Sequence, residues 1–469
     1  MKKFLRRLCR AVVGLIGLVA AFYVVENWRG KYAWEKYRHE REALGDSFEW
    51  SSIVPPPVPD AENFAATPLF AELFPKSPEH PHLAAAKLPE CPTAAGNWRV
   101  GRVENLAAWQ TCFSNDNLLA ALSKYDPILT EIADASHRPK CRFPIRYEDN
   151  YRARHPHLRH LLQLAGDYRL RALAELAAGQ TDRALADVRF CLRLANFLED
   201  EPLLVSYNVR NGIQGILDLA IQPVWEGLAA HRWTNAQLDV LQAEFGRVDQ
   251  FNTLAKAMRG ERLSSFDVIS WAIKQPVRVR VKLLQTSEDT RTESYAFGVA
   301  PIGWWYRNLL TADRFHTETY LLAIDAEHRM IKPLLVSKID NTISVTTPYN
   351  VLWKLIIPSV ASIAKKTAQS QTALDQVVTA CALERYRLAK GELPEKLDAL
   401  VPAFIAKVPH DVIDGQPLRY RRTAADQFVL YSVGWDETDD GGQIVLPHDK
   451  SSRPDFDKGD WVWSSDRLE

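Results

Sequence analysis

The N-terminus limits what this chain can fold into more than any other segment, because a basic cluster is followed by an uncharged apolar run. The cluster consists of Lys2, Lys3, Arg6, Arg7 and Arg10. The run extends over residues 11–25, and fifteen residues of α-helix rise roughly 22 Å. Leu8 and the apolar stem of Arg10 bring this length closer to the ~30 Å of a bilayer's hydrocarbon core. The segment therefore predicts one transmembrane helix.

The residues around the apolar run predict its orientation. A basic flank stays in the cytoplasm, so we expect a single-pass protein of the inner (cytoplasmic) membrane with its bulk outside the cytoplasm. The alternative is a cleaved signal peptide, because Val19-Ala-Ala21 has the small residues of a cleavage site. An uncleaved signal-anchor is preferred, since the run continues to Val25 and since Arg29 and Lys31 suit a membrane-surface flank.

Composition restricts the class of protein. The chain has 469 residues, of which 46% are apolar and 25% charged, as in globular proteins with two or three domains. Lys and Arg together number 58, and so do Asp and Glu. A neutral chain has no overall attraction for nucleic acid, so we expect no nucleic-acid partner.

The cysteines predict neither a zinc site nor a lipid anchor, because none are in CxxC spacing and none follow a lipobox-like stretch. They are Cys9, Cys91, Cys112, Cys141, Cys191 and Cys381. Cys91, Cys112 and Cys141 are either free or paired in an oxidising compartment, and free thiols are preferred. The last two occupy core positions of predicted helices and are expected to be buried thiols.

Residues 28–96 change from helix to extended chain. The charged and aromatic stretch 28–48 is expected to continue the anchor helix away from the membrane. The run Ile53-Val-Pro-Pro-Pro-Val-Pro59 excludes helix and predicts a stiff, extended spacer. Further prolines keep the chain irregular as far as Pro92. A docking segment for a proline-binding module is the alternative.

A helical hairpin is the clearest element of the central region. Its helices are predicted over 161–178 and 182–198, with Gly179 ending the first and Thr181 or Asp182 capping the second. The hairpin resembles one tetratricopeptide repeat. A stable array needs at least three copies, and none follow, so an irregular helical domain is preferred. Further helices are expected over 203–227, 235–260 (capped by Thr234 or Asn235) and 309–331.

Histidines occur in two suggestive places. His316 and Glu318 share a predicted helix with Glu327 and His328, but metal-ligand spacing is lacking and a solvated helix face is preferred. A second cluster lies among arginines and consists of His155, His157 and His160. It suits an anion or a lipid headgroup, but a loop before a helix N-terminus is preferred.

The C-terminal region changes from helix to a small sheet. A helix is predicted over 371–390, where Gly391 ends it and Pro394 prevents its restart. A short helical turn follows over 397–401. Candidate strands are 418–421, 428–431 and 461–463, of which the first two form a hairpin.

Four passages in this region carry a family resemblance. They are Tyr386-Arg-Leu-Ala-Lys-Gly-Glu-Leu-Pro394, Leu397-Asp-Ala-Leu-Val-Pro402, Asp414-Gly-Gln-Pro-Leu-Arg-Tyr420 and Phe428 to Gly442. Together they make residues 371–463 resemble the globular head of the major pseudopilins of type II secretion. Pseudopilins begin with a prepilin leader and an apolar helix that carries Glu at its fifth position, which this chain lacks. The resemblance therefore implies a pseudopilin-like head at the end of a larger protein, not a pilus subunit.

The middle of the chain resembles a second group. Gly179-Gln180, Asp200-Glu-Pro202 and Ala257-Met-Arg-Gly-Glu-Arg262 make residues 155–260 similar to uncharacterised bacterial membrane-anchored helical proteins. This resemblance implies an envelope location and carries no activity.

The pseudopilin resemblance implies calcium in two acidic C-terminal loops. The carboxylates are Asp436, Asp439 and Asp440 in the first loop, and Asp455, Asp457 and Asp460 in the second. Carboxylate and carbonyl oxygens on flexible loops suit calcium, although the spacing is not that of an EF-hand. The alternative is a set of solvated turn residues.

No motif identifies a reaction, because GxSxG, P-loop, GxGxxG-after-strand and SxxK patterns are absent. Catalytic residues therefore stay unassigned. A deep cleft with converging carboxylates or histidines would favour an enzyme, whereas a shallow apolar groove would favour a binding module.

We predict a mostly α protein with an N-terminal transmembrane helix, an irregular α-helical domain and a small C-terminal α+β head. The expected segments are 1–27, 28–96, 97–365 and 371–469. The expected function is binding or scaffolding at the cell envelope, linked to a secretion or pilus-like system. The alternative is an extracytoplasmic hydrolase with its site in the helical domain. The expected partners are the lipid bilayer and another envelope protein.

Overall fold

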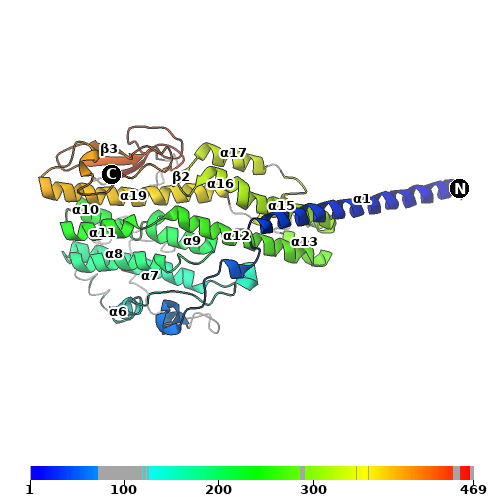
Figure 1. The fold of residues 1–469 in the computed structure, drawn as a ribbon, viewed down its shortest axis with the longest axis horizontal. Coiled ribbons are helices and arrows are strands. Elements are labelled where there is room, and N and C mark those ends of the chain that lie inside the picture. Colours follow the sequence, from blue (N-terminus) through cyan, green and yellow to red (C-terminus); the bar gives the residue numbers. More distant parts are fainter. Residues whose placement is uncertain are drawn as a thin grey trace, which may run out of the picture.

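One long helix projects from a body of packed helices (Figure 1). The structure, a computed structural model, describes residues 2–71, 119, 123, 126–285, 291–344, 346–356, 359–446 and 455–464. Helices dominate these residues and strands are few, which confirms the mostly α fold class.

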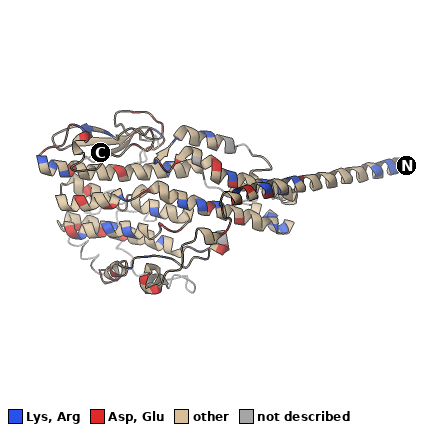
Figure 2. Ribbon diagram, in the orientation of Figure 1, with Lys and Arg blue, Asp and Glu red and all other residues tan. Residues whose placement is uncertain are grey.

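The projecting helix is α1 (Lys2–Ala43), and it is long and apolar enough to cross a membrane. Basic residues mark its tip, an uncharged stretch follows, and charges return where the helix reaches the body (Figure 2). The apolar side chains of residues 11–25 are largely exposed. Contacts with the body begin at the end of the run, at Phe22 and Tyr23. The predicted continuation of the anchor helix is confirmed as far as Ala43.

Short elements connect α1 to the helical body. They are η1 (Trp50–Ser52), η2 (Asp60–Glu62), η3 (Phe64–Ala66), α2 (Pro68–Ala71), α6 (Asp126–Ala135) and η5 (Tyr147–Arg152). Residues 55–59 are extended, as the prolines predict. The later prolines, including Pro92, lie outside the described residues, and so do Cys91 and Cys112.

The predicted hairpin is formed by α7 (Pro156–Ala177) and α8 (Thr181–Asn196). Gly179 joins them with a φ of +78°, a conformation that favours glycine. Cys191 is a free thiol fully buried between these helices, as predicted, and Cys381 is also free and buried.

The next helices are shorter than the sequence predicts. They are α9 (Leu204–Asn211), the π-helix η6 (Gly212–Ile216), α10 (Ile221–Ala229), α11 (Asn235–Gly246) and α12 (Gln250–Ile273). Thr234 caps α11 in a capping box with Gln237. The continuous helix predicted over 235–260 is wrong, because Asp249 accepts the backbone N–H of Asn252 and starts α12 anew.

Residues 277–356, where the sequence showed no clear periodicity, contain nine elements in their described parts. They are α13 (Val277–Leu284), α14 (Arg291–Val299), α15 (Ile302–Arg314), the π-helix η7 (Phe315–Thr319), α16 (Tyr320–Ala323), β1 (Ile324–Asp325), β2 (Met330–Ile331), α17 (Pro333–Ser344) and α18 (Val351–Ile356). The helix predicted as far as Ile331 is wrong after Ala323. Ile331 instead pairs with Ile324 and donates its N–H to Val412 at 2.8 Å.

The C-terminal strands lie over the long helix α19 (Val360–Lys390), which ends at Gly391 with a φ of +83° as predicted. After η8 (Leu397–Leu400), the strands β3 (Arg419–Arg422), β4 (Phe428–Ser432) and β5 (Trp461–Ser464) form one antiparallel sheet in that order. This confirms the predicted hairpin and the last strand. Gln376 of α19 donates to the backbone oxygen of Trp461 at 2.7 Å.

Two hydrophobic cores hold the body together. Leu430 and Trp463 of the sheet share the first core with α7, α8, α11 and α19. The second core joins α1, α12, α15 and the start of α19. The three-layered arrangement of α7–α8, α9–α12 and α19 is visible in Figure 1. The C-terminal strands therefore pack directly on the helical body, because their buried residues share the first core with its helices. The helix α19 contributes residues to both cores.

Candidate ligand-binding cavity at the anchor junction

The second half of α1 is fixed against α15. Gly30 and Gly303 lie at the crossing, and a Cβ atom on either one would come closer than 3.0 Å to backbone atoms of the other helix. The backbone N–H of Gly303 donates to the Asn27 side chain at 2.9 Å. Close backbone contact of this kind needs glycine on both helices.

The contact begins inside the apolar run. The Phe22 ring meets the Trp304 ring edge to face at 6.3 Å, and the Tyr23 hydroxyl donates to the Val299 carbonyl at 2.8 Å. If α1 spans a membrane, the end of α14 and the start of α15 therefore lie at the membrane surface.

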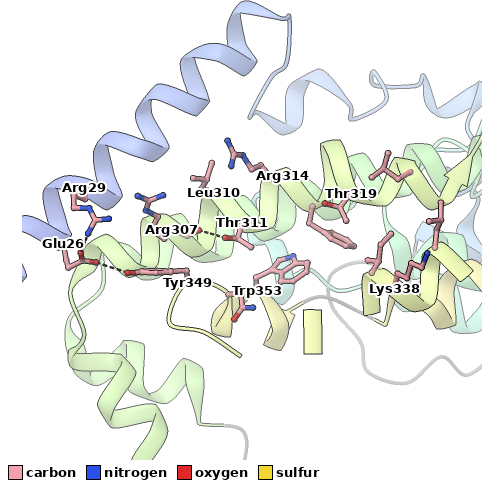
Figure 3. Close-up of a pocket in the computed structure, with 15 residues that line it drawn as sticks. Glu26, Arg29, Arg307, Leu310, Thr311, Arg314, Thr319, Lys338, Tyr349 and Trp353 are labelled. Carbon is pink, nitrogen blue, oxygen red and sulfur yellow. Dashed lines mark hydrogen bonds and ion pairs between the residues drawn. The ribbon is translucent and has the colours of Figure 1, made fainter. Parts of the chain in front are cut away.

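A cavity of about 700 Å³ lies beside this junction, between α1, α15, α17 and α18 (Figure 3). Its cationic lining residues are Arg29, Arg307, Arg314 and Lys338. Its apolar lining residues are Leu310, Phe315, Leu322, Leu335, Ile339 and Trp353. A cavity of this size is typical of sites for small molecules.

Glu26 is the one carboxylate in the described lining, and its oxygens are already in use. It pairs with Arg29 at 2.8 Å and accepts hydrogen bonds from Trp304 Nε1 at 3.0 Å and from the Tyr349 hydroxyl at 3.3 Å. It is therefore a structural acceptor that holds the rim of the cavity, not a free acid or base.

Two of the four cations in the cavity, Arg307 and Arg314, are not neutralised by a carboxylate of the described residues. The Arg314 guanidinium lies 5.3 Å from the centre of the Tyr37 ring, a cation–π contact that leaves its hydrogen-bond donors for other partners. The cavity is therefore built for negative charge.

The inner end of the cavity is aromatic. The Phe315 and Trp353 rings lie 4.7 Å apart, and Phe315 and Thr319 are the two ends of the π-helix η7. A π-helix widens a helix locally and often occurs at functional sites. Here it directs both residues into the lining.

A buried network of charged and polar side chains lies next to the cavity. The Arg262 guanidinium donates two hydrogen bonds, of 2.7 and 3.1 Å, to the Asp313 carboxylate. The Tyr37 hydroxyl donates to the same carboxylate at 3.0 Å. Burial raises the pKa of Tyr37 to about 12. Burial, with the nearby charge of Arg262, lowers the pKa of His316 to about 3. His316 is thus a neutral, buried residue, and the predicted solvated face is wrong for it.

The remaining residues of that histidine prediction lie elsewhere. Glu327 and His328 lie in the turn between β1 and β2, where His328 Nδ1 is 2.7 Å from Asp325. Glu318 is exposed. These residues therefore do not converge on one site.

The second histidine cluster is structural. His155 lies at the N-cap position of α7, and His157 is fully buried with Nε2 3.0 Å from Glu201. Ser206 also donates to Glu201, at 2.5 Å. Burial, together with the charge of Glu201, raises the pKa of the Cys141 thiol well above its usual value, which leaves the thiol unreactive. The preferred interpretation, a loop before a helix N-terminus, holds for His155 only, because His157 and His160 lie within the first turns of α7.

A smaller cavity of about 250 Å³ lies between α10, α19 and β4. It contains His231, which is 2.9 Å from Glu384, and Asp426. Glu384 is also held by Arg387 at 2.7 Å. Glu384 is therefore paired on both sides and is not itself a free base.

The two acidic loops lie side by side, but their carboxylates bind the backbone. Asp436 accepts the N–H of Gly459 at 3.0 Å, and Asp460 accepts that of Gly442 at 2.6 Å. Asp440 lies next to Asp460, which accepts its backbone N–H. Burial raises the pKa of the Asp460 carboxyl.

The other three carboxylates are also engaged. Asp439 accepts the Tyr431 hydroxyl at 3.1 Å, Asp455 accepts the N–H of Asp457 at 3.1 Å, and Asp457 pairs with Lys365 of α19. Within the described ranges, no group of three or more His, Cys, Asp or Glu side chains is placed to hold a metal ion. Calcium at these loops stays a prediction that rests on the resemblance.

The sequence did not identify the residues that organise the C-terminal sheet and the junction cavity. Asp411 is fully buried and accepts the Val433 N–H at 3.0 Å and the Ser432 hydroxyl at 2.9 Å, so it joins the turn before β3 to the end of β4. Arg307 and Trp353 belong to a stretch without clear periodicity. The signal that could have marked the cavity was the run of three aromatic residues directly before a cation in Trp304-Trp-Tyr-Arg307.

No family model matches this chain, and no curated protein and no solved structure is significantly similar to it.

Proposed function

We propose that this chain is a membrane-anchored binding protein of the bacterial cell envelope, with its ligand in the cavity at the anchor junction. The observation that carries the proposal is the construction of that cavity, in which the anchor helix itself supplies Glu26 and Arg29. A ligand held there contacts the anchor and the body together, at the point where the chain leaves the bilayer.

The chemistry of the lining favours binding over hydrolysis. The described lining contains four cations and one carboxylate, and that carboxylate is fully hydrogen-bonded. A hydrolase needs a nucleophile with its base, or a free acid and base pair, within hydrogen-bond distance of the substrate. The lining supplies neither, whereas cations over an apolar floor suit recognition.

The proposed arrangement places the N-terminus in the cytoplasm and the body outside the inner membrane. The basic tip of α1 supports this orientation, because basic flanks stay in the cytoplasm. Another envelope protein is the proposed partner of the C-terminal sheet. The resemblance of residues 371–463 to pseudopilin heads supports a link to a secretion or pilus-like system.

Photo-crosslinking in intact cells tests the binding role. A photoreactive benzoylphenylalanine at Thr319, inside the cavity, should capture a specific adduct, and the same residue at Glu395, whose side chain is 85% exposed, should not. The mass of the adduct identifies the kind of ligand. No adduct at position 319, or equal labelling at both positions, would contradict the proposed function.

A further inference from the structure

We infer that the ligand of the junction cavity is an anionic phospholipid taken from the membrane that α1 crosses. The inference rests on the proposed function and names the ligand class for the same cavity. Three observations carry it: the position of the cavity, its charge and its apolar floor.

The cavity begins at membrane level. Glu26 directly follows the apolar run, and Arg29 comes one helical turn later, so both lining residues lie within roughly 6 Å of the end of the run along the helix axis. The end of the cavity formed by these two residues therefore lies close to the surface of a bilayer that α1 spans.

The surface around the junction is suited to lie against a bilayer. The side chains of Trp28, Tyr32, Tyr295 and Val299 are about half exposed or more, with values of 66%, 57%, 54% and 49%. Trp and Tyr concentrate at the level of lipid headgroups, where one end of the side chain is apolar and the other is wet. These residues suit a position of the α1–α15 junction at the level of the lipid headgroups.

The charges of the cavity match a phosphodiester. Figure 3 shows Arg29, Arg307 and Arg314 on the α1 side of α15, and Tyr349, Trp353 and Lys338 on the side of α17 and α18. Guanidinium groups bind phosphate oxygens with two parallel hydrogen bonds, and Arg307 is the half-buried one of the three arginines. Among the described residues, no carboxylate competes for Arg307 or Arg314.

The apolar floor decides between a lipid and a soluble anion. Leu310, Phe315, Leu335, Ile339 and Trp353 line the cavity, and Leu322 at its edge is 68% exposed. A free phosphate would leave this apolar surface in contact with water, and a neutral apolar ligand would leave the arginines without a counter-charge. A phospholipid satisfies both, because its acyl chain covers the floor while its phosphate meets the guanidinium groups.

Lipid retention by the purified full-length protein tests the inference. The protein is extracted in mild detergent, and native mass spectrometry and extraction identify the lipids that remain bound. We expect phosphatidylglycerol to be retained over phosphatidylcholine when the protein is reconstituted with an equal mixture. Arg307→Glu should lower this retention roughly tenfold, whereas Arg232→Glu, an exposed position outside the cavity, should leave it unchanged.

Two further arms separate the sources of phosphate and control for folding. Millimolar inorganic phosphate should not displace the lipid, and displacement would indicate a headgroup-only ligand and overturn the inference. Arg307→Gln, which removes the charge but keeps a polar hydrogen-bond donor, should lower retention about fivefold if the charge matters. Equal retention of the two lipids, or full retention in folded Arg307→Glu, would also overturn it. A non-lipid adduct from position 319 would contradict the lipid but keep the binding role, whereas no adduct would contradict both.

Discussion

Gly30 of α1 and Gly303 of α15 meet backbone to backbone, so the helix that is long and apolar enough to cross a membrane is held directly against the body. The Asn27 side chain, which accepts the Gly303 N–H at 2.9 Å, fixes the rotation of one helix on the other. The position of the cavity follows from this crossing, because the helices that meet here supply two of its walls.

Enlarging Gly303 should therefore separate the anchor from the body. We expect Gly303→Val to lower the free energy of unfolding by about 1–3 kcal/mol, because a side chain at this crossing must displace backbone. The control is Gly166→Ala in α7, where a Cβ meets nothing within 4 Å and the change should be neutral or stabilising. Denaturant unfolding in detergent measures both variants, and equal effects would contradict the proposed rigid crossing.

The Arg262–Asp313 pair should be costly to break on one side only. Asp313→Ala removes the nearer of the two carboxylates that pair with the Arg262 guanidinium and leaves only Asp46, at 3.2 Å. We expect a loss of about 3 kcal/mol in the free energy of unfolding, the low end for a buried ion pair broken on one side. The double variant Arg262→Met with Asp313→Leu removes both charges and should be considerably more stable than the single variant. If the double variant were no more stable to unfolding than Asp313→Ala, the interactions of Tyr37 and Asp46, and not the unpaired charge, would account for the loss.

Glu261 of α12 gives a prediction for pH. Burial raises the pKa of its carboxyl from 4.5 to about 7, so the folded state binds the proton more tightly than the unfolded state. This contribution to stability is complete below pH 4.5 and is lost as the pH rises through 7. Glu261→Gln should remove the loss and be about 1–3 kcal/mol more stable than the native chain at pH 8. Chemical unfolding at pH 4, 6 and 8 checks this, and parallel pH curves for the two proteins would refute it.

Calcium at the acidic loops is tested by thermal unfolding of the full-length protein. The pseudopilin resemblance predicts a higher melting temperature in calcium than in chelator, because an ion that binds only the folded state stabilises it. Asp436→Asn should abolish the difference, and magnesium serves as the control ion. Equal melting temperatures of the native protein in calcium and in chelator would remove the metal prediction.

Local signals in the sequence predicted the elements that local interactions determine. Gly179 and Gly391 end helices in left-handed conformations, Thr234 caps α11, and β3 and β4 pair as a hairpin across the short connection 423–427. In each case the deciding interaction lies within a few residues of the signal. These elements could therefore be located from the chain alone.

Long-range contacts explain the elements that the sequence did not predict. The helix predicted through Ile331 ends early because Ile331 donates its N–H to Val412, some eighty residues later. The cavity is hidden for the same reason, since Glu26 and Tyr349 are joined by a hydrogen bond across 323 positions of sequence. Gly260 and Pro202, from two passages that carry the resemblance of the middle region, pack against each other, which gives these passages a structural role.

The central claim is that α1 stays in the membrane while the body lies outside the cytoplasm. Two reporters fused after Glu469 test it in living cells: alkaline phosphatase, which is active only after export, and a green fluorescent protein, which fluoresces only inside. The account predicts an active phosphatase fusion and a dark fluorescent fusion, each recovered at full length in the membrane fraction. A fluorescent fusion, or a body released into the soluble fraction, would contradict it.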